Sequence, residues 1–219
     1  MFEITEEILD SHIEKLLDII EGIKEKRITL LVGANGTGKS LIRKQLNVRF
    51  IKQYNANRNM VRHVSQQMRT ELRSDMGALA CIAMDNPEDP TSMCSFDMIN
   101  KVTNYDMKEK DYYIVLDEAE IGMSEESVLG LCEHLKGVLP EWLENSLGIL
   151  IITHSSLLAE YIHSNFDCDF YNIGYNNYSQ DFDAWKAREI KPTDFNWLSD
   201  WSLALFRRVN DRSKKLKKG

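Results

Sequence analysis

Residues 33–40 of this 219-residue chain read Gly-Ala-Asn-Gly-Thr-Gly-Lys-Ser, which fits the spacing G-x-x-x-x-G-K-[ST]. An apolar run, residues 28–32, leads into this segment, and a helix-like stretch, residues 41–50, leads out of it. Glycines at this spacing let the backbone adopt positive φ and bring its N–H groups against phosphates. The sequence therefore predicts a strand, a phosphate-binding loop and a helix. The loop consists of Gly33, Ala34, Asn35, Gly36, Thr37, Gly38, Lys39 and Ser40.

The last two residues of this loop carry its chemistry. Lys39 is placed to reach the β- and γ-phosphates of a nucleotide, and the Ser40 hydroxyl is placed to ligate Mg²⁺. The loop therefore predicts a nucleoside triphosphate, bound together with Mg²⁺, as the ligand.

Length and composition predict a single α/β domain, residues 1–219, with an appended piece. Hydrophobic residues make up 43% of the chain, which is enough for a core.

The four cysteines are scattered without a C-x-x-C pair: Cys81, Cys94, Cys132 and Cys168. We therefore expect reduced thiols in a cytoplasmic protein, no zinc site and no disulfide framework. No apolar run approaches a membrane span, and the acidic N-terminus does not fit a signal peptide.

The charge is unevenly distributed. The net charge of −7 indicates that the protein as a whole is not built to coat nucleic acid. The tail Arg212–Lys218 is strongly basic, and Arg207 and Arg208 precede it by about a turn. Two interpretations remain open. The tail is either a solvated helix end, where cations suit the helix dipole, or an arm that contacts nucleic acid or another acidic partner.

Periodicity and turn residues predict the order of elements. The final helix has an apolar side that we expect to dock on the body of the protein, formed by Trp197, Trp201, Leu203, Leu205 and Phe206. The expected elements are a helix 5–24, strands 28–32 and 60–65, a helical insert at about 68–110, a strand 112–116, a helix 124–138 ended by Pro140, a strand 148–153, a helix 155–164, antiparallel strands 166–175 and 182–190, and a helix 193–215.

Two further motifs follow buried strands. Asp117 and Glu118 end the apolar run that begins at Tyr112. We expect this strand to lie beside the phosphate-loop strand, with Asp117 holding Mg²⁺ and Glu118 polarising a water for attack on the γ-phosphate. Thr153 and His154 end another apolar run, at the same carboxyl edge of the sheet where ligands bind in such folds. His154 is there placed to hydrogen-bond the γ-phosphate or the attacking water.

Together these motifs resemble the ABC-type ATPase family, above all its small, membrane-free members in DNA repair, mobile elements, phages and anti-phage systems. Residues 33–40 are similar to the family's GxNGxGKS form, residues 116–124 to its LDEPExGLS segment with Ala119 in place of Pro, and residues 152–155 to its switch-histidine segment. The resemblance covers roughly residues 28–190. It implies an α/β P-loop NTPase fold: a mostly parallel sheet with flanking helices, an ABC-ATPase-like core, a short helical insert and a C-terminal helix.

The resemblance also implies ligands and partners. ATP and Mg²⁺ would be bound, and Gln66 would be the family's glutamine that touches Mg²⁺ and the attacking water, with Gln67 as the alternative. Residues 124–127 fall where the family has a loop that crosses a dimer interface. An ATP-dependent homodimer or hetero-complex through the nucleotide face is therefore implied.

The chain departs from the family in two places. The family's LSGGQ-type signature is absent, and residues 91–96, which stand at its position, contain no glycine. Ser92 or Ser95 there equally fits a helix N-cap. An amphipathic helix also precedes the first core strand, where the family usually has antiparallel strands and an aromatic residue that stacks on adenine. Phe2 is the only nearby upstream aromatic.

Three functions fit the sequence. The first is an ABC-type ATPase that hydrolyses ATP slowly and uses it as a conformational or assembly switch, in DNA-related, phage or defence processes. The second is a P-loop kinase for a nucleotide or polynucleotide end, with a lid arginine such as Arg62, Arg69 or Arg73; Glu118 directly after Asp117 favours water activation instead. The third is a binding module that ATP gates with little turnover.

Overall fold

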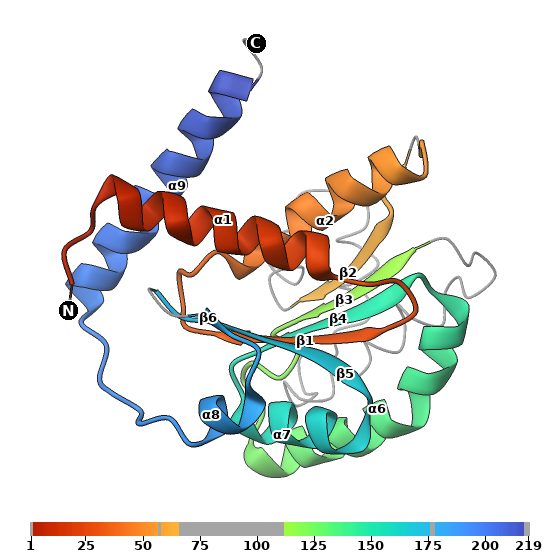
Figure 1. Cartoon of the computed structure of the whole chain (residues 1–219). Helices are drawn as coiled ribbons and strands as arrows, with labels where there is room; N and C mark the ends of the chain where they lie inside the picture. Colours follow the sequence, from red (N-terminus) through yellow and green to blue (C-terminus); the bar gives the residue numbers. More distant parts are fainter. Residues whose placement is uncertain (1, 57, 66–111, 176–177, 217–219) are drawn as a thin grey trace, which may run out of the picture.

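The computed structural model describes residues 2–56, 58–65, 112–175 and 178–216 (Figure 1). Several sequence predictions fall outside this range and stay predictions: the helical insert 68–110, the signature-like segment 91–96, and the residues Gln66, Gln67, Arg69 and Arg73.

The described strands form a six-stranded sheet in the order β2-β3-β4-β1-β5-β6. The first five strands in this order pair in parallel, and β6 pairs antiparallel to β5 at one edge. The strands are β1 Ile28–Gly33, β2 Val61–Ser65, β3 Tyr113–Asp117, β4 Gly148–Thr153, β5 Cys168–Ile173 and β6 Tyr178–Ser179.

Helices cover both faces of this sheet, with α1 and α2 on one face and α6, α7 and α8 on the other (Figure 1). The central strands β1, β3 and β4 are therefore buried on both faces, which explains why their sequences are almost continuously apolar. The helices are α1 Glu6–Gly22, α2 Lys39–Gln53, α6 Glu125–Asn145, α7 Ser156–Asn165, α8 Phe182–Lys186 and α9 Phe195–Leu216.

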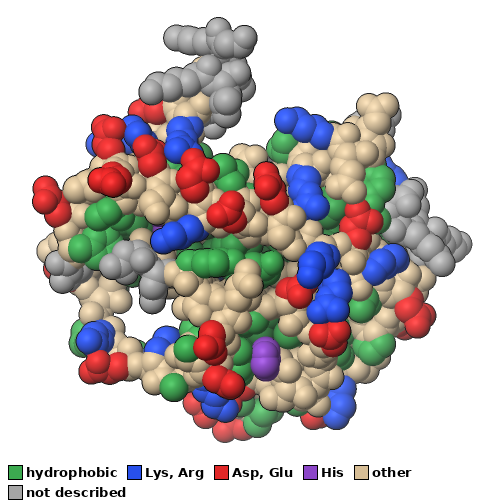
Figure 2. Space-filling model, viewed as in Figure 1, with side chains coloured by type: hydrophobic (Ala, Val, Ile, Leu, Met, Phe, Trp, Pro, Cys, Tyr) green, Lys and Arg blue, Asp and Glu red, His purple; other side chains and the backbone are tan. Residues whose placement is uncertain are grey.

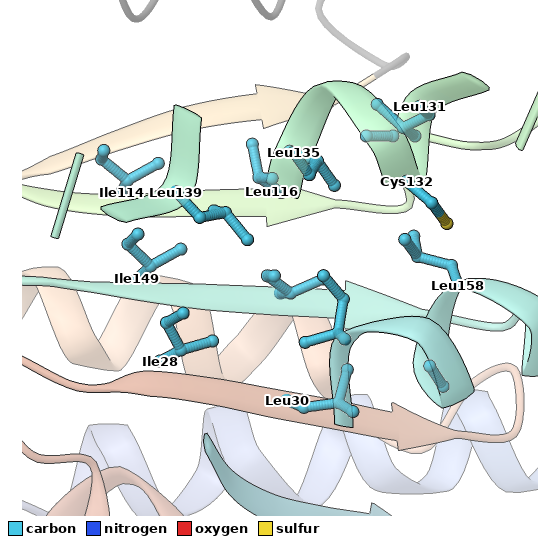
Figure 3. Packing of buried hydrophobic residues seen from close by; sticks show 14 of the residues in the cluster. Ile28, Leu30, Ile114, Leu116, Leu131, Cys132, Leu135, Leu139, Ile149 and Leu158 are labelled. Carbon is cyan, nitrogen blue, oxygen red and sulfur yellow. The ribbon is translucent and has the colours of Figure 1, made fainter. Parts of the chain in front are cut away.

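Alternation along each strand separates two cores. Leu30 of β1 and Leu116 of β3 face the layer formed by α6 and α7, where Leu135 packs against the sheet (Figure 3). Leu31 and Val115, one position away, face α1 and α2. This alternation is the period of two expected of a strand that buries both its faces.

The C-terminal helix α9 docks on α1 and on the start of the chain. Trp201 and Leu205 are buried against Leu9 and Ile13, whereas Leu203 is 47% exposed. Phe206, also predicted to face the body, is 65% exposed. The predicted docking side is therefore correct for Trp201 and Leu205 and wrong for Leu203 and Phe206, because α9 meets α1 along a narrow stripe.

The predicted neighbour of the phosphate-loop strand is wrong. Strand β4, and not β3, lies beside β1 on this side, and it separates β1 from β3, the strand that ends in Asp117. Ile149 of β4 is in register with Ile28 of β1 and with Ile114 of β3. Every residue of β4 is buried, as a strand enclosed by two neighbours and two helical layers requires.

Two element predictions are also wrong. Pro140 does not end the helix that precedes it but lies inside α6. Pro140 is exposed, while Leu139 and Trp142 keep this part of the helix packed. Residues 182–190 do not form a strand: Asp181 caps the short helix α8 by accepting a hydrogen bond from Ala184 N.

None of the described helices combines the length and the apolar content that a membrane crossing requires.

Candidate functional site

The phosphate loop joins the end of β1 to the start of α2, as the sequence predicts. Gly36 (φ 72°) and Gly38 (φ 93°) are both in the left-handed region. Gly38 is the N-cap of α2 and has no side chain to occupy the first free N–H groups of the helix. The Thr37 hydroxyl donates to the Ala34 carbonyl at 2.8 Å and holds the loop closed. The loop therefore presents backbone donors of the kind that bind phosphate.

Lys39 lies under the loop with its side chain only 6% exposed. Its Nζ donates to the carbonyls of Gly33 at 3.2 Å and Ala34 at 2.9 Å. The same atom lies 3.0 Å from His154 Nε2 and 3.8 Å from Glu118 Oε1. Burial lowers the pKa of Lys39 to about 8, against the opposing effect of the carboxylates of Glu118 and Asp117.

Glu118 and His154 meet in front of Lys39. Glu118 follows β3 with φ 54°, a left-handed conformation that turns its side chain toward the loop, and its Oε1 is 2.6 Å from His154 Nε2. The hydrogen bond from His154 is the main cause that lowers the pKa of Glu118. When His154 Nε2 carries a proton, it donates to Glu118 and has no lone pair to accept from Lys39. When Nε2 is unprotonated, it accepts from Lys39 and has no proton to donate to Glu118, so only one of the two hydrogen bonds forms at a time.

Asp117 contacts a histidine that the sequence predictions did not single out. His63 Nε2 lies 3.2 Å from Asp117 Oδ2, and His63 Nδ1 lies 2.5 Å from Arg43 Nη1. A guanidinium donates and does not accept, so Nδ1 is the acceptor and Nε2 carries the proton that it donates to Asp117. Only the strand order, which places β2 beside β3, could have identified His63.

Glu120 is a second residue that the sequence predictions left without a role. Its side chain is buried, and Oε1 accepts hydrogen bonds from the Thr153 hydroxyl, from His154 N at 3.1 Å and from Ser155 N at 3.4 Å. It therefore contacts the turn between β4 and α7 that carries His154.

The other side of the loop is covered by α1, α9 and Tyr175. His12 of α1 lies with Nε2 2.8 Å from the Thr37 carbonyl, and the Tyr175 hydroxyl donates to the Asn35 carbonyl at 2.9 Å. A methyl group added at Gly36 would collide with the Ser202 hydroxyl of α9. No local pattern in the sequence predicted these contacts.

Ser40 and Asp117 carry the oxygen donors that Mg²⁺ prefers. Ser40 is exposed at the start of α2, and within the described residues the Asp117 carboxylate contacts only His63, through Oδ2. A hydroxyl and a carboxylate with a free oxygen fit a hard divalent cation. The third predicted ligand, Gln66, lies outside the described residues.

No family model and no curated protein matches the chain. Among solved structures it is similar to the dimeric structure of MJ0796, a bacterial ABC transporter cassette, with a TM-score of 0.43 and 13% identity over 70% of this chain and 84% of that one. It is also similar to Drosophila ORC bound to AT-rich DNA and Cdc6, with a TM-score of 0.37 and 14% identity over 76% of this chain and 29% of that one. For the Aeropyrum pernix ORC2 protein the TM-score is 0.34 and the identity 11%, over 77% of this chain and 46% of that one.

The fold is that of a P-loop NTPase. The described residues themselves establish it, because a parallel sheet with helices on both faces carries the glycine-rich loop between β1 and α2. The prediction of an α/β core with a mostly parallel sheet and flanking helices is confirmed. The chain spans less than a third of the Drosophila ORC chain.

Proposed function

We propose that the protein is an ATPase of the ABC type that binds Mg·ATP through its phosphate loop and hydrolyses it slowly. The observation that carries the proposal is the meeting of Lys39, Glu118 and His154 at one edge of the sheet. They come from three separate elements and contact one another at 3.0 and 2.6 Å, beside the loop that we propose binds the phosphates.

Each of these groups has a separate task in the proposed reaction. The loop N–H groups and Lys39 stabilise the negative charge on the β- and γ-phosphates. Glu118, held ionised by its lowered pKa, orients and polarises the attacking water, and His154 supports the water or the γ-phosphate. The water oxygen bonds to the γ-phosphorus, and the bond between the γ-phosphorus and the β–γ bridging oxygen breaks to release ADP. Of the two water protons, one stays on inorganic phosphate and the other passes to Glu118 and then to solvent.

Ser40 and Asp117 would hold the Mg²⁺, and Gln66 is the third candidate ligand. The bound ion would neutralise charge that develops between the β- and γ-phosphates. His63 donates to Asp117 and so fixes one carboxylate oxygen, which leaves the other for the ion or its water.

A switch role, through ATP-dependent assembly, is the finer part of the proposal. Residues 124–127 lie at the exposed start of α6, next to the loop that carries Glu118. Ser124 caps this helix by accepting a hydrogen bond from Ser127 N at 3.3 Å. Such a surface beside the nucleotide supports a homodimer or a hetero-complex, and the resemblance of the motifs supports DNA-related, phage or defence processes.

Two observations bear on the alternatives. The guanidinium of Arg62, a candidate lid residue for a kinase, lies 3.9 Å over the Tyr112 ring. In the basic tail, Arg212 lies 2.6 Å from Glu14 and 3.2 Å from Asp10, and Arg208 also pairs with Asp10. Acidic and basic side chains are interspersed over the face in Figure 2. A nucleic-acid arm would therefore depend on the tail lysines, such as the exposed Lys214, and not on these arginines.

Glu118→Gln tests the proposal. We expect the variant to bind ATP with wild-type affinity and to lose hydrolysis by about two orders of magnitude or more, the usual scale for a positioned general base. Glu141→Gln, which changes an exposed acid of α6 outside residues 124–127, is the matched control and should hydrolyse ATP normally. Wild-type turnover by Glu118→Gln would overturn the assignment.

Light scattering of Glu118→Gln with and without Mg·ATP tests the switch. A doubled mass with ATP supports the homodimer. An unchanged mass with ATP bound removes the homodimer and leaves assembly with a different protein.

A further inference from the structure

We infer that Glu120 is a positioning residue that holds His154 in place for the reaction. The inference rests on the proposed function, because it concerns the same site. Glu118 contacts the imidazole of His154, whereas Glu120 accepts a hydrogen bond from the backbone N–H of the same residue. Two acids of one short loop therefore contact the turn that carries His154.

The contacts of Glu120 converge on a single atom. Oε1 accepts from the Thr153 hydroxyl, from His154 N at 3.1 Å and from Ser155 N at 3.4 Å. The Thr153 hydroxyl in turn accepts from Ser155 N at 2.9 Å. The last residue of β4, the histidine and the N-cap of α7 are therefore held by one carboxylate and one hydroxyl.

The loop that carries both acids is itself fixed. Glu118 N donates to the Ile152 carbonyl at 2.8 Å, Ile121 N donates to the Glu118 carbonyl at 3.2 Å, and Met123 N donates to the Glu120 carbonyl at 3.0 Å. Glu118 then faces the phosphate loop while Glu120 faces inward and is only 7% exposed. The imidazole and the carboxylate it contacts are thus placed by the same loop.

A buried carboxylate is a costly way to hold a turn. Within the described residues Glu120 has no ion-pair partner, and its second oxygen, Oε2, is buried without a hydrogen-bond partner. An amide or a hydroxyl could cap a turn at lower desolvation cost. A carboxylate is favoured where a turn must be held rigidly by strong, charge-assisted hydrogen bonds.

Glu120→Ala should therefore reduce kcat by on the order of tenfold, less than the hundredfold that a 1 Å misplacement can cost. ATP affinity should stay close to the wild-type value, because among the described residues Glu120 makes no hydrogen bond to Lys39 or the phosphate loop and its charge is the smallest of the named influences on the pKa of Lys39. Thr153→Val should give a smaller loss and Thr153→Ser should restore the wild-type rate, since serine keeps the hydroxyl and valine keeps the shape.

A double-mutant cycle separates positioning from a general structural role. If Glu120 acts through His154, then Glu120→Ala adds little to the loss in kcat already caused by His154→Ala. Losses that multiply, or a loss that follows the fraction of unfolded protein, would overturn the inference. If the wild-type protein does not hydrolyse ATP, the proposed function is wrong. The role of Glu120 must then be tested by a measurement that does not depend on turnover.

The ring resonances of His154 in the nucleotide-free protein supply that readout. Glu120→Ala should shift them, and so should Glu118→Gln, whereas Glu141→Gln, at an exposed acid of α6, should leave them in place. Unshifted ring resonances in a folded Glu120→Ala variant would refute the inference whether or not the protein hydrolyses ATP.

Discussion

The two sides of the phosphate loop differ in the kind of side chain that contacts them. On the side of β3 and β4, the groups beside the loop are titratable: Glu118 and His154, which contact Lys39 of the loop itself. On the side of α1 and α9, the loop is covered by packing, in which Trp201 lies edge-on to His12 at a centroid distance of 5.2 Å and Leu16 stands against Gly38. The first side is suited to chemistry and the second to holding the loop in shape.

This difference predicts separate consequences for substitution. Changes on the charged side should alter nucleotide binding and hydrolysis and leave the free energy of unfolding almost unchanged. Changes on the covered side should lower the free energy of unfolding first, because that side joins residues about 190 positions apart into one small core.

Lys39→Ala should give the largest effect, the loss of Mg·ATP binding. The substitution removes the loop cation but no apolar core group, so the melting temperature should change little. Lys44→Ala, an exposed lysine of the same helix α2, is the matched control and should bind ATP normally. Calorimetric titration and thermal unfolding of the two variants check this, and retained ATP affinity in Lys39→Ala would remove the basis for a phosphate loop.

Trp201→Ala should lower the free energy of unfolding by about 3–5 kcal/mol, the range for removing a fully buried large aromatic. Phe206→Ala, one turn further along α9 but 65% exposed, should stay within about 0.5 kcal/mol of wild type. Urea denaturation measures both. If Trp201→Ala were as mild as Phe206→Ala, the α9 side would not stabilise the loop, and the comparison between the two sides would fail.

The sequence was informative on one side of the loop because its signals are local. Glycine spacing predicts the loop, and an apolar run ending in an acid or a histidine predicts a strand that delivers that residue to the carboxyl edge. The partners of Asp117 and His154 depend instead on strand order. Because β2 lies beside β3 and β4 lies between β3 and β1, His63 reaches Asp117 and Glu120 reaches Thr153.

On the covered side, no local signal was available. A tryptophan at position 201 predicts a buried face, but the amphipathic pattern does not say which helix that face will meet. The contact of α9 with α1 brings the two ends of the chain together. It pairs Arg208 with Asp10 and Arg212 with Glu14. For the same reason, a basic run that could have been a free arm is in part an interhelical ion-pair cluster.

The smallest expected effect concerns pH and His12, which links the two helices to the loop. Burial is the main cause that lowers the pKa of His12 below its usual value of 6.5, opposed by its hydrogen bond to the Thr37 carbonyl, while Lys15 lowers it further. The neutral ring donates from Nε2 to that carbonyl in the folded protein. In the unfolded chain, the same ring titrates near its ordinary pKa.

Below pH 6.5 the unfolded chain therefore binds a proton that the folded protein does not, so the free energy of unfolding should fall as the pH drops through this window. His12→Gln should remove this contribution and flatten the difference between pH 7.5 and pH 5.5. Lys15→Gln should flatten it only in part, because the cation is a secondary cause of the shift. Parallel curves for wild type and His12→Gln would mean that His12 takes up its proton in the folded state as easily as in water. Burial at this position would then not disfavour the charged imidazole, and the contact of His12 with the Thr37 carbonyl would not require a neutral ring.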